Sequence, residues 1–256
     1  MILRIWVLAS NTVREALRSK LLYTLLGFGV ALILFALALS NLSYIESERI
    51  LQGFGFASIR LFSVAIAIFV GVNLIHKEVD RRTVYTILSK PLSRGEFLIG
   101  KYLGLLLTIW IQLAIMIVFF VGTSMLTASP LDIGYLAAFA LIAVELAVVV
   151  AIATLFSAFT TPMLASFFSA GLWSVGHLTR DLRQLGAQAN DPSIQSATAW
   201  LHRLLPDLES FNLTIEAVHH LPVAASDVWL PTIYGIGYAS ILLVTAVVVF
   251  ERRDLR

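Results

Sequence analysis

Two ionisable side chains, Arg60 and Glu145, lie within long apolar stretches of the sequence. Such a group inside a membrane-spanning helix costs about 2.5 to 3.5 kcal/mol on insertion scales, so it normally faces a partner or a polar cavity. Arg60 is expected in the outer third of one span and Glu145 near the middle of another, so a direct pair needs Arg60 to reach inward by more than one helical turn. Both residues are therefore candidates for an intramembrane polar pathway, with pairing or snorkelling of Arg60 as the structural alternative.

The other motifs offer little catalytic chemistry. Residues 95–102, GEFLIGKY, imitate a phosphate-binding loop, but Tyr102 replaces the Ser or Thr that would hold magnesium, and no strand precedes the segment. Gly100 and Gly104 instead form a small-xxx-small pair that favours close helix packing. Cysteine is absent, the five His residues show no metal-ligand spacing, and no GxSxG motif is present. His177, at the end of an apolar stretch, is expected at a membrane interface.

A charged interval, residues 76–101, separates two of the apolar stretches. It carries six Lys/Arg residues, and its apolar positions recur at roughly helical spacing before Pro91. Pro91 should end that helix, and Ser93 with Glu96 three residues later forms a capping box for the next one. Because a short basic loop between membrane spans marks the cytoplasmic side, we expect this interval to face the cytoplasm.

The composition places the elements around these residues in a membrane. Hydrophobic residues make up 59% of the 256 residues and charged residues only 13%, with a mean hydropathy of +0.88. Soluble domains carry about 25% charged residues. The sequence therefore predicts an all-α integral membrane protein as a single domain over residues 1–256.

Six membrane spans account for the apolar stretches, each close to the length of about 20 residues that a bilayer requires. The expected spans are residues 21–40, 54–75, 102–126, 133–156, 162–178 and 229–250, with Pro162 at the first position of the fifth. Lys/Arg residues concentrate before the first span, in the charged interval and in the tail after the last span. The positive-inside rule then places both termini in the cytoplasm.

Two further segments are expected outside the spans. Residues 1–20 alternate Arg and Lys with apolar residues, as in an amphipathic helix lying in the membrane interface. Residues 179–228 form the long external segment between spans five and six. Within it, Asp191 and Pro192 start a helix with an apolar stripe, which ends at Pro206.

The order of residues in the charged interval resembles the ABC-2 type transporter permease family. An acidic residue, a Thr, a Pro, Ser-Arg and Gly-Lys lead into a span, here as Glu78, Thr83, Pro91, Ser93, Arg94, Gly100 and Lys101. The family usually has Gly before the Thr, where this chain has Arg82. The resemblance extends to the whole chain, since the span count also agrees, and to residues 204–214, LLPDLESFNLT, which are similar to the segment that such permeases carry before their last span.

The resemblance implies an exporter subunit with no ATPase site of its own. A separate ABC ATPase, in two copies, would bind ATP and Mg²⁺ and dock on an amphipathic coupling helix at residues 77–90, while this chain binds no cofactor or metal. The docking and coupling residues would be Lys77, Glu78, Asp80, Arg81, Arg82, Thr83, Pro91 and Arg94. A second permease copy or a related permease, membrane lipids and a periplasmic protein are the other expected partners, in a bacterial inner membrane and without nucleic acid.

Other functions stay open from the residues alone. An ion-gradient-driven secondary transporter could use Glu145 as a protonatable site, but such transporters show repeats and interrupted spans in matching halves, which the sequence lacks. A lipid-modifying membrane enzyme would need polar residues clustered at one depth, and a membrane scaffold would leave the Pro91, Ser93 and Glu96 pattern without a purpose. Under the transport hypotheses, Glu145→Gln should alter transport more than folding.

Overall fold

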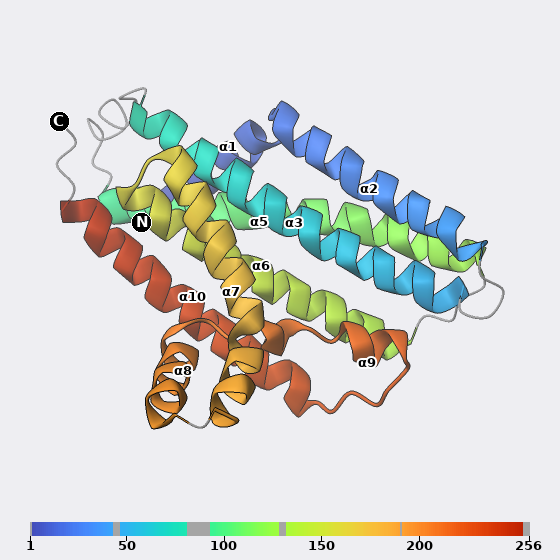
Figure 1. Cartoon of the computed structure of the whole chain (residues 1–256). Coiled ribbons are helices and arrows are strands. Elements are labelled where there is room, and N and C mark those ends of the chain that lie inside the picture. Colours follow the sequence, from blue (N-terminus) through green and yellow to red (C-terminus); the bar gives the residue numbers. More distant parts are fainter. Residues whose placement is uncertain (1, 43–46, 81–92, 128–131, 190, 253–256) are drawn as a thin grey trace.

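The computed structural model describes residues 2–42, 47–80, 93–127, 132–189 and 191–252, and all secondary structure in these ranges is helical (Figure 1). The helices are α1 Ile2–Ala16, α2 Lys20–Ser40, α3 Ser47–Asp80, α5 Arg94–Leu126, α6 Ile133–Phe159, α7 Pro162–Ala187, α8 Pro192–Leu204, the 3-10 helix η1 Leu208–Phe211, α9 Thr214–Val218 and α10 Ser226–Arg252. The all-α fold is as predicted.

Five of the described helices are long and apolar enough to cross a membrane, namely α2, α3, α5, α6 and α10. The sixth predicted span, residues 162–178, lies in α7, which is a helix but does not meet that requirement. Ser, Gly and His residues interrupt its apolar stretch, and its second half carries Arg180, Asp181 and Arg183. The count of six spans therefore stays a prediction.

Helix boundaries follow the predicted stop and start signals closely. Ser93 accepts a hydrogen bond from the backbone N–H of Glu96, and the Glu96 carboxylate accepts one from the N–H of Ser93, so the predicted capping box is confirmed. Pro162 lies in the first turn of α7, and Asp191 caps α8 through the N–H of Ser193, as predicted.

The helices on either side extend into the predicted interval, residues 76–101. Helix α3 continues without a break to Asp80, and α5 begins at Arg94, directly after Ser93, where the capping box predicted a helix start. The start of the proposed coupling helix, Lys77, Glu78 and Asp80, is therefore the last turn of α3 rather than a separate helix. A charged turn can extend a spanning helix into water, because the intrahelical hydrogen bonds do not depend on side-chain polarity.

Helices α3 and α6 form the centre of the bundle, and α2 and α10 lie at its periphery (Figure 1). Rings of Phe56, Phe120, Tyr135 and Phe139 pack together between α3, α5 and α6, with centroids 5.0 to 6.3 Å apart. Each such pair contributes about 0.5 to 1.5 kcal/mol beyond simple burial. Large apolar side chains of α2 and α10, such as Phe28 and Ile241, are exposed and available to lipid or to another protein.

Helix α1 packs directly against α5. A Cβ added at Gly104 would lie 2.6 Å from the carbonyl oxygen of Ala9, and one added at Gly100 would lie 2.7 Å from Cβ of Leu8, so only glycine allows this approach. The prediction of close packing at this glycine pair is thereby confirmed. One face of α1 is buried on α5, while Trp6 on the opposite side is 63% exposed.

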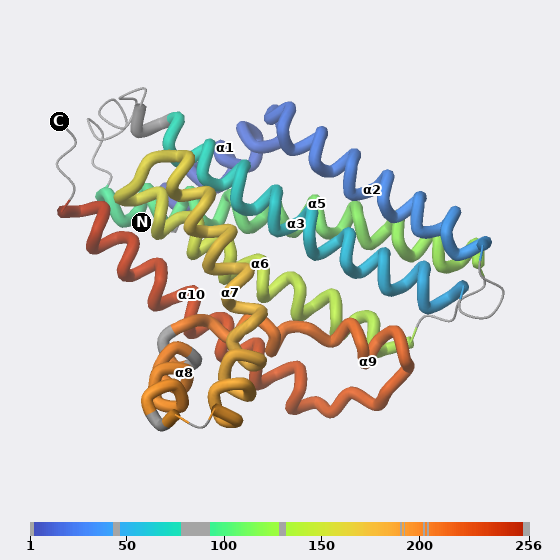
Figure 2. Tube along the Cα trace, viewed as in Figure 1, coloured from blue at the N-terminus to red at the C-terminus, as the bar shows by residue number. Residues whose placement is uncertain are grey.

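The segment between α8 and α10, residues 205–221, turns back toward the bundle and packs on α6, α7 and α3 (Figure 2). Its apolar side chains Leu208 and Phe211 are fully buried. Gly176 of α7 makes room for it, because a Cβ there would lie 2.8 Å from the Leu208 side chain and 3.1 Å from the carbonyl oxygen of Pro206. The inward-facing apolar side chains of the 205–221 segment are therefore part of the core.

Candidate functional site

The first candidate site is a buried charge network centred on Glu145. Glu145 lies in the middle of α6 and is completely buried. Its Oε1 accepts hydrogen bonds from Nε1 of Trp173 at 2.9 Å and from Nε2 of His177 at 3.0 Å, and both donors belong to α7. A buried carboxylate is tolerated only when such donors or a cation replace water.

Arg60 supplies the cation. Its Nε lies 3.2 Å from Oε2 of Glu145, and its Nη2 donates a hydrogen bond to the carbonyl oxygen of Phe211 at 3.3 Å. The Nε and Oε2 atoms form an ion pair without the alignment of a hydrogen bond. Arg60 and Glu145, predicted separately from the sequence, are therefore direct partners, and Arg60 also reaches the 205–221 segment.

His177 extends the network to that same segment. Its Nδ1 lies 3.0 Å from Oε2 of Glu209, and Oε1 of Glu209 accepts a hydrogen bond from Nδ2 of Asn212 at 2.8 Å. Burial alone would raise the pKa of Glu209, but the hydrogen bonds from His177 and Asn212 outweigh it and hold that pKa below its ordinary value. Side-chain contacts thus run from Arg60 through Glu145 and His177 to Glu209, and they join α3, α6, α7 and η1.

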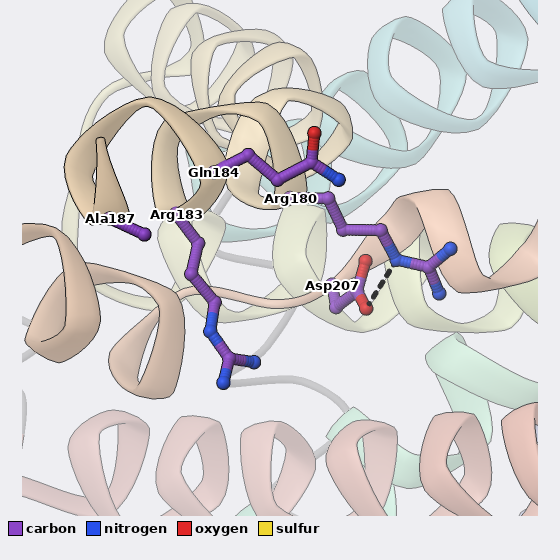
Figure 3. A pocket seen from close by; sticks show the side chains of 5 residues that line it. All are labelled: Arg180, Arg183, Gln184, Ala187 and Asp207. Atoms are coloured by element: carbon purple, nitrogen blue, oxygen red, sulfur yellow. Dashed lines mark hydrogen bonds and ion pairs between the residues drawn. The ribbon is translucent and has the colours of Figure 1, made fainter.

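A cleft of about 420 Å³ lies along the second half of α7, beginning at Arg180, three positions after His177 (Figure 3). It is lined by Arg180, Arg183, Gln184 and Ala187 of α7 and by Asp207. Nε of Arg180 donates to Oδ2 of Asp207 at 3.1 Å. Together with the pair of His177 and Glu209, this bond fastens the 205–221 segment to two successive turns of α7.

The second candidate site is the charged end of the bundle, defined by Glu15, Lys77, Arg94 and Lys101. The Glu15 carboxylate of α1 lies 2.6 Å from Nζ of Lys77 at the end of α3 and 3.5 Å from Nζ of Lys101 in α5. Burial would raise the pKa of Glu15, but the two ammonium groups hold it below its ordinary value. Glu15 therefore joins α3 and α5, the two helices at either end of the charged interval.

Arg94 binds the opposite side of this charged end. Its Nη1 donates to the carbonyl oxygens of Phe250 at 3.3 Å and of Glu251 at 3.0 Å, the two residues before the last residue of α10. A cation at a helix C-terminus satisfies free carbonyl groups and opposes the negative end of the helix dipole. The start of α5 is thus attached to the end of α10.

The predicted docking residues are only partly described by the structure. Lys77 and Arg94 lie at the charged end, each engaged as given above. Glu78 and Asp80 belong to the last turn of α3, and the orientation of their side chains is not described. The predicted docking residues Arg81, Arg82, Thr83 and Pro91 lie outside the described residues.

Several residues of both sites were not recognised from the sequence. His177 was expected at a membrane interface, but its side chain points inward between two carboxylates and is 17% exposed. Glu209 and Glu15 carried no signal of their own, since their partners lie 32 or more positions away. The spacing of four residues between Trp173 and His177, which places both on one face of α7, was the available clue.

The described residues contain no group of three or more His, Cys, Asp or Glu side chains that could hold a metal ion. Neither candidate site provides an activated nucleophile, and both consist of charges paired across helices. Such pairs hold neighbouring helices together, and they must move or repack when one helix shifts against another.

Residues 6–255 match the family model described as ABC-2 family transporter protein. The chain belongs to the ABC-2 family. No curated protein sequence matches it closely enough to add a relative. As an ABC-2 member with several apolar helices, it is a multi-pass membrane permease of an ABC transporter, and the family implies an ABC ATPase subunit as its partner. Membrane components of this family usually lack an ATPase site of their own.

Proposed function

We propose that this ABC-2 permease is the membrane subunit of an exporter driven by ATP hydrolysis on a separate ATPase. Two ATPase subunits bind ATP and Mg²⁺, and they dock on the cytoplasmic side of a pair of permease subunits. The pair is a homodimer or includes a related permease. The host membrane is a bacterial inner membrane, with both termini of the chain in the cytoplasm and a periplasmic protein as a further partner.

The single observation that carries this proposal is the attachment of Glu15 to both Lys77 and Lys101. Lys77 and Lys101 lie near the two ends of the charged interval, residues 76–101, which holds all eight proposed docking residues. A force applied there by an ATPase would move the ends of α3 and α5 and the attached α1 as a unit. Arg94 would pass the same displacement to α10.

The buried charge network is the proposed receiver of this displacement. Helix α3 carries Lys77 at one end of its length and Arg60 near its middle, so a shift of α3 must either carry Glu145 along or strain the ion pair. We propose that Arg60 and Glu145 line the export pathway once the 205–221 segment moves away from them. In the present arrangement Glu145 is completely buried.

Affinity purification tests the proposal. The tagged chain is purified in mild detergent, the co-purifying proteins are identified by mass spectrometry, and ATP hydrolysis is measured. The Glu78→Ala/Arg81→Ala variant should lose the ATPase or its stimulation, because it removes two charges from the proposed docking element. The matched control, Arg183→Ala/Glu216→Ala, removes the same two charge types from the proposed external side and should behave as the parent.

Absence of any ATPase from the parent preparation would contradict the proposed function. Equal loss of the ATPase from the docking variant and the control would contradict the assigned docking element. The ion-gradient-driven transporter, with Glu145 as a protonatable site, is the second candidate, favoured by the buried carboxylate that contacts His177. It would predict transport that follows a proton gradient and continues without ATP.

A further inference from the structure

His177 lies between two carboxylates, and this geometry determines how many protons the three side chains must hold. Its Nε2 is 3.0 Å from Oε1 of Glu145, and its Nδ1 is 3.0 Å from Oε2 of Glu209. An ionised carboxylate can only accept hydrogen bonds, and a neutral imidazole has a single N–H to donate. Both contacts are satisfied only if the group of three holds one additional proton, on His177 or on one of the two carboxyl groups.

The surrounding charges favour His177 as the carrier of that proton. Arg60 lies against Oε2 of Glu145, and Trp173 donates to its Oε1, so positive or N–H groups already face both oxygens of this carboxylate. Asn212 donates to Glu209 in the same way. With a protonated His177, the network contains two positive and two negative charges, whereas a neutral His177 leaves a buried negative charge uncompensated.

The contact between His177 and Glu209 also holds a structural element in its position. Glu209 belongs to η1 of the 205–221 segment, which has only short helical elements of its own. This segment is attached to α7 by the pair of His177 and Glu209 and by the pair of Arg180 and Asp207. The pair of Arg180 and Asp207 contains no imidazole, so a proton gained or lost by His177 acts on the first attachment alone.

We propose that the Glu145, His177 and Glu209 side chains form a proton-binding latch that fixes the 205–221 segment to the membrane core. When the pH rises and the proton leaves, one imidazole nitrogen faces a carboxylate oxygen with no hydrogen between them, and the attachment through Glu209 is lost. The segment then moves away from α6 and α7 more readily and uncovers Arg60 and Glu145. The role of this opening in export rests on the proposed function, but the proton site does not.

Three charged groups act on the imidazole: Glu145 of α6, Glu209 of η1 and Arg60 of α3. Arg180 lies one turn along α7 and pairs with Asp207 of the segment, whose N–H donates to the hydroxyl of Tyr234 of α10. His177 is the imidazole of this cluster, and imidazole is the side-chain type whose charge changes nearest to neutral pH.

Two measurements on the purified permease test the latch, and neither needs the ATPase. Nitrogen-15 NMR of histidine-labelled protein in lipid nanodiscs reports whether both ring nitrogens carry protons, and the His177→Gln spectrum identifies the signal among the five His residues. Hydrogen exchange of residues 205–221, corrected for the chemical exchange rate, reports how often the segment opens.

The latch predicts a doubly protonated His177 at about pH 6 and loss of one proton as the pH is raised to about 10. Over the same range, exchange of the 205–221 segment should increase about tenfold. In His177→Gln the increase with pH should be absent. In the matched control Arg180→Gln, exchange should be faster at every pH but should keep its pH-dependent step.

Glu209→Gln provides a second variant should His177→Gln fail to fold. Its pH-dependent exchange step should also be absent, because an amide can accept a hydrogen bond from the protonated ring and donate one to the neutral ring. The proposal is overturned if His177 carries a single proton over the whole range in the parent. It is equally overturned if exchange shows no pH-dependent step, or if the step persists in His177→Gln. A purified permease that shows the latch but binds no ATPase would contradict the proposed function alone.

Discussion

Oε1 of Glu145 lies 3.0 Å from Nε2 of His177, which joins the middle of α6 to α7 at a completely buried position. The two residues are 32 positions apart in the sequence. The same carboxylate faces Arg60 of α3, so the charged contacts among α3, α6 and α7 at this site depend on one side chain. The consequences of that dependence can be measured.

We predict that Glu145→Gln destabilises the folded protein by about 3 to 5 kcal/mol, because it leaves the Arg60 guanidinium buried without its counter-charge. This changes the expectation from the sequence alone, under which transport was to suffer more than folding. Thermal unfolding in detergent measures the effect. The control Glu216→Gln, a half-buried carboxylate of α9, should change the unfolding temperature little.

The double variant Arg60→Met/Glu145→Gln should be more stable than the sum of its single variants predicts. Removing both members of a buried ion pair leaves no uncompensated charge, whereas removing one member does. The expected coupling free energy is about 1 to 3 kcal/mol, within the range for directly contacting residues. Strictly additive effects would show that the 3.2 Å contact between Nε and Oε2 contributes nothing to stability.

Gly104→Ala should separate α1 from α5 at a cost of about 1 to 3 kcal/mol, since the new methyl group would overlap the backbone of Ala9. Gly122→Ala in the same helix is the matched control, because its added Cβ would meet no atom within 4 Å. That control should be neutral or slightly stabilising, by up to about 1 kcal/mol. Protease sensitivity of the N-terminal segment and thermal unfolding distinguish the two variants.

Glu15 should make stability depend on pH in the acidic range. Lys77 and Lys101 hold the pKa of Glu15 below its ordinary value of 4.5 in the folded protein, so its contribution is present above that value and is lost as the pH falls through the folded pKa. The parent should exceed Glu15→Gln in stability by about 1 kcal/mol at neutral pH. The difference should shrink below pH 4.5, and a difference that grows on acidification would contradict the assignment.

The absence of cysteine allows a direct test of orientation with single-cysteine variants. The sequence places Ser196 of α8 outside and Arg252 at the end of α10 in the cytoplasm, and both residues are exposed. A membrane-impermeant maleimide should therefore label Ser196→Cys in intact cells and Arg252→Cys only after permeabilisation. The reverse pattern would contradict the predicted orientation.

Local signals made most helix ends predictable from the sequence. The hydrogen bonds between Ser93 and Glu96, the Asp191 cap and Pro162 act within one helical turn, so residue spacing alone indicates them. The same is true of the packing at Gly100 and Gly104, where small residues four positions apart allow a close helix. The α3 boundary was missed because charged residues do not by themselves end a helix.

The candidate site was only half predictable. The cost of burying charge identified Arg60 and Glu145, but the distance between them along the chain left the pairing open. His177 and Glu209 have ordinary sequence surroundings, and only the return of the 205–221 segment into the bundle brings Glu209 to the imidazole. That return depends on Gly176, whose missing side chain makes room for Leu208.

The docking of an ATPase and the release of the 205–221 segment are tested most directly in one measurement. Hydrogen exchange of this segment is measured in the purified complex without nucleotide and after trapping the ATPases with ATP and orthovanadate. We predict faster exchange of the segment in the trapped complex, and no such change in Glu78→Ala/Arg81→Ala. Unchanged exchange in a parent complex that hydrolyses ATP would contradict the transmission of ATPase movement to the buried charge network.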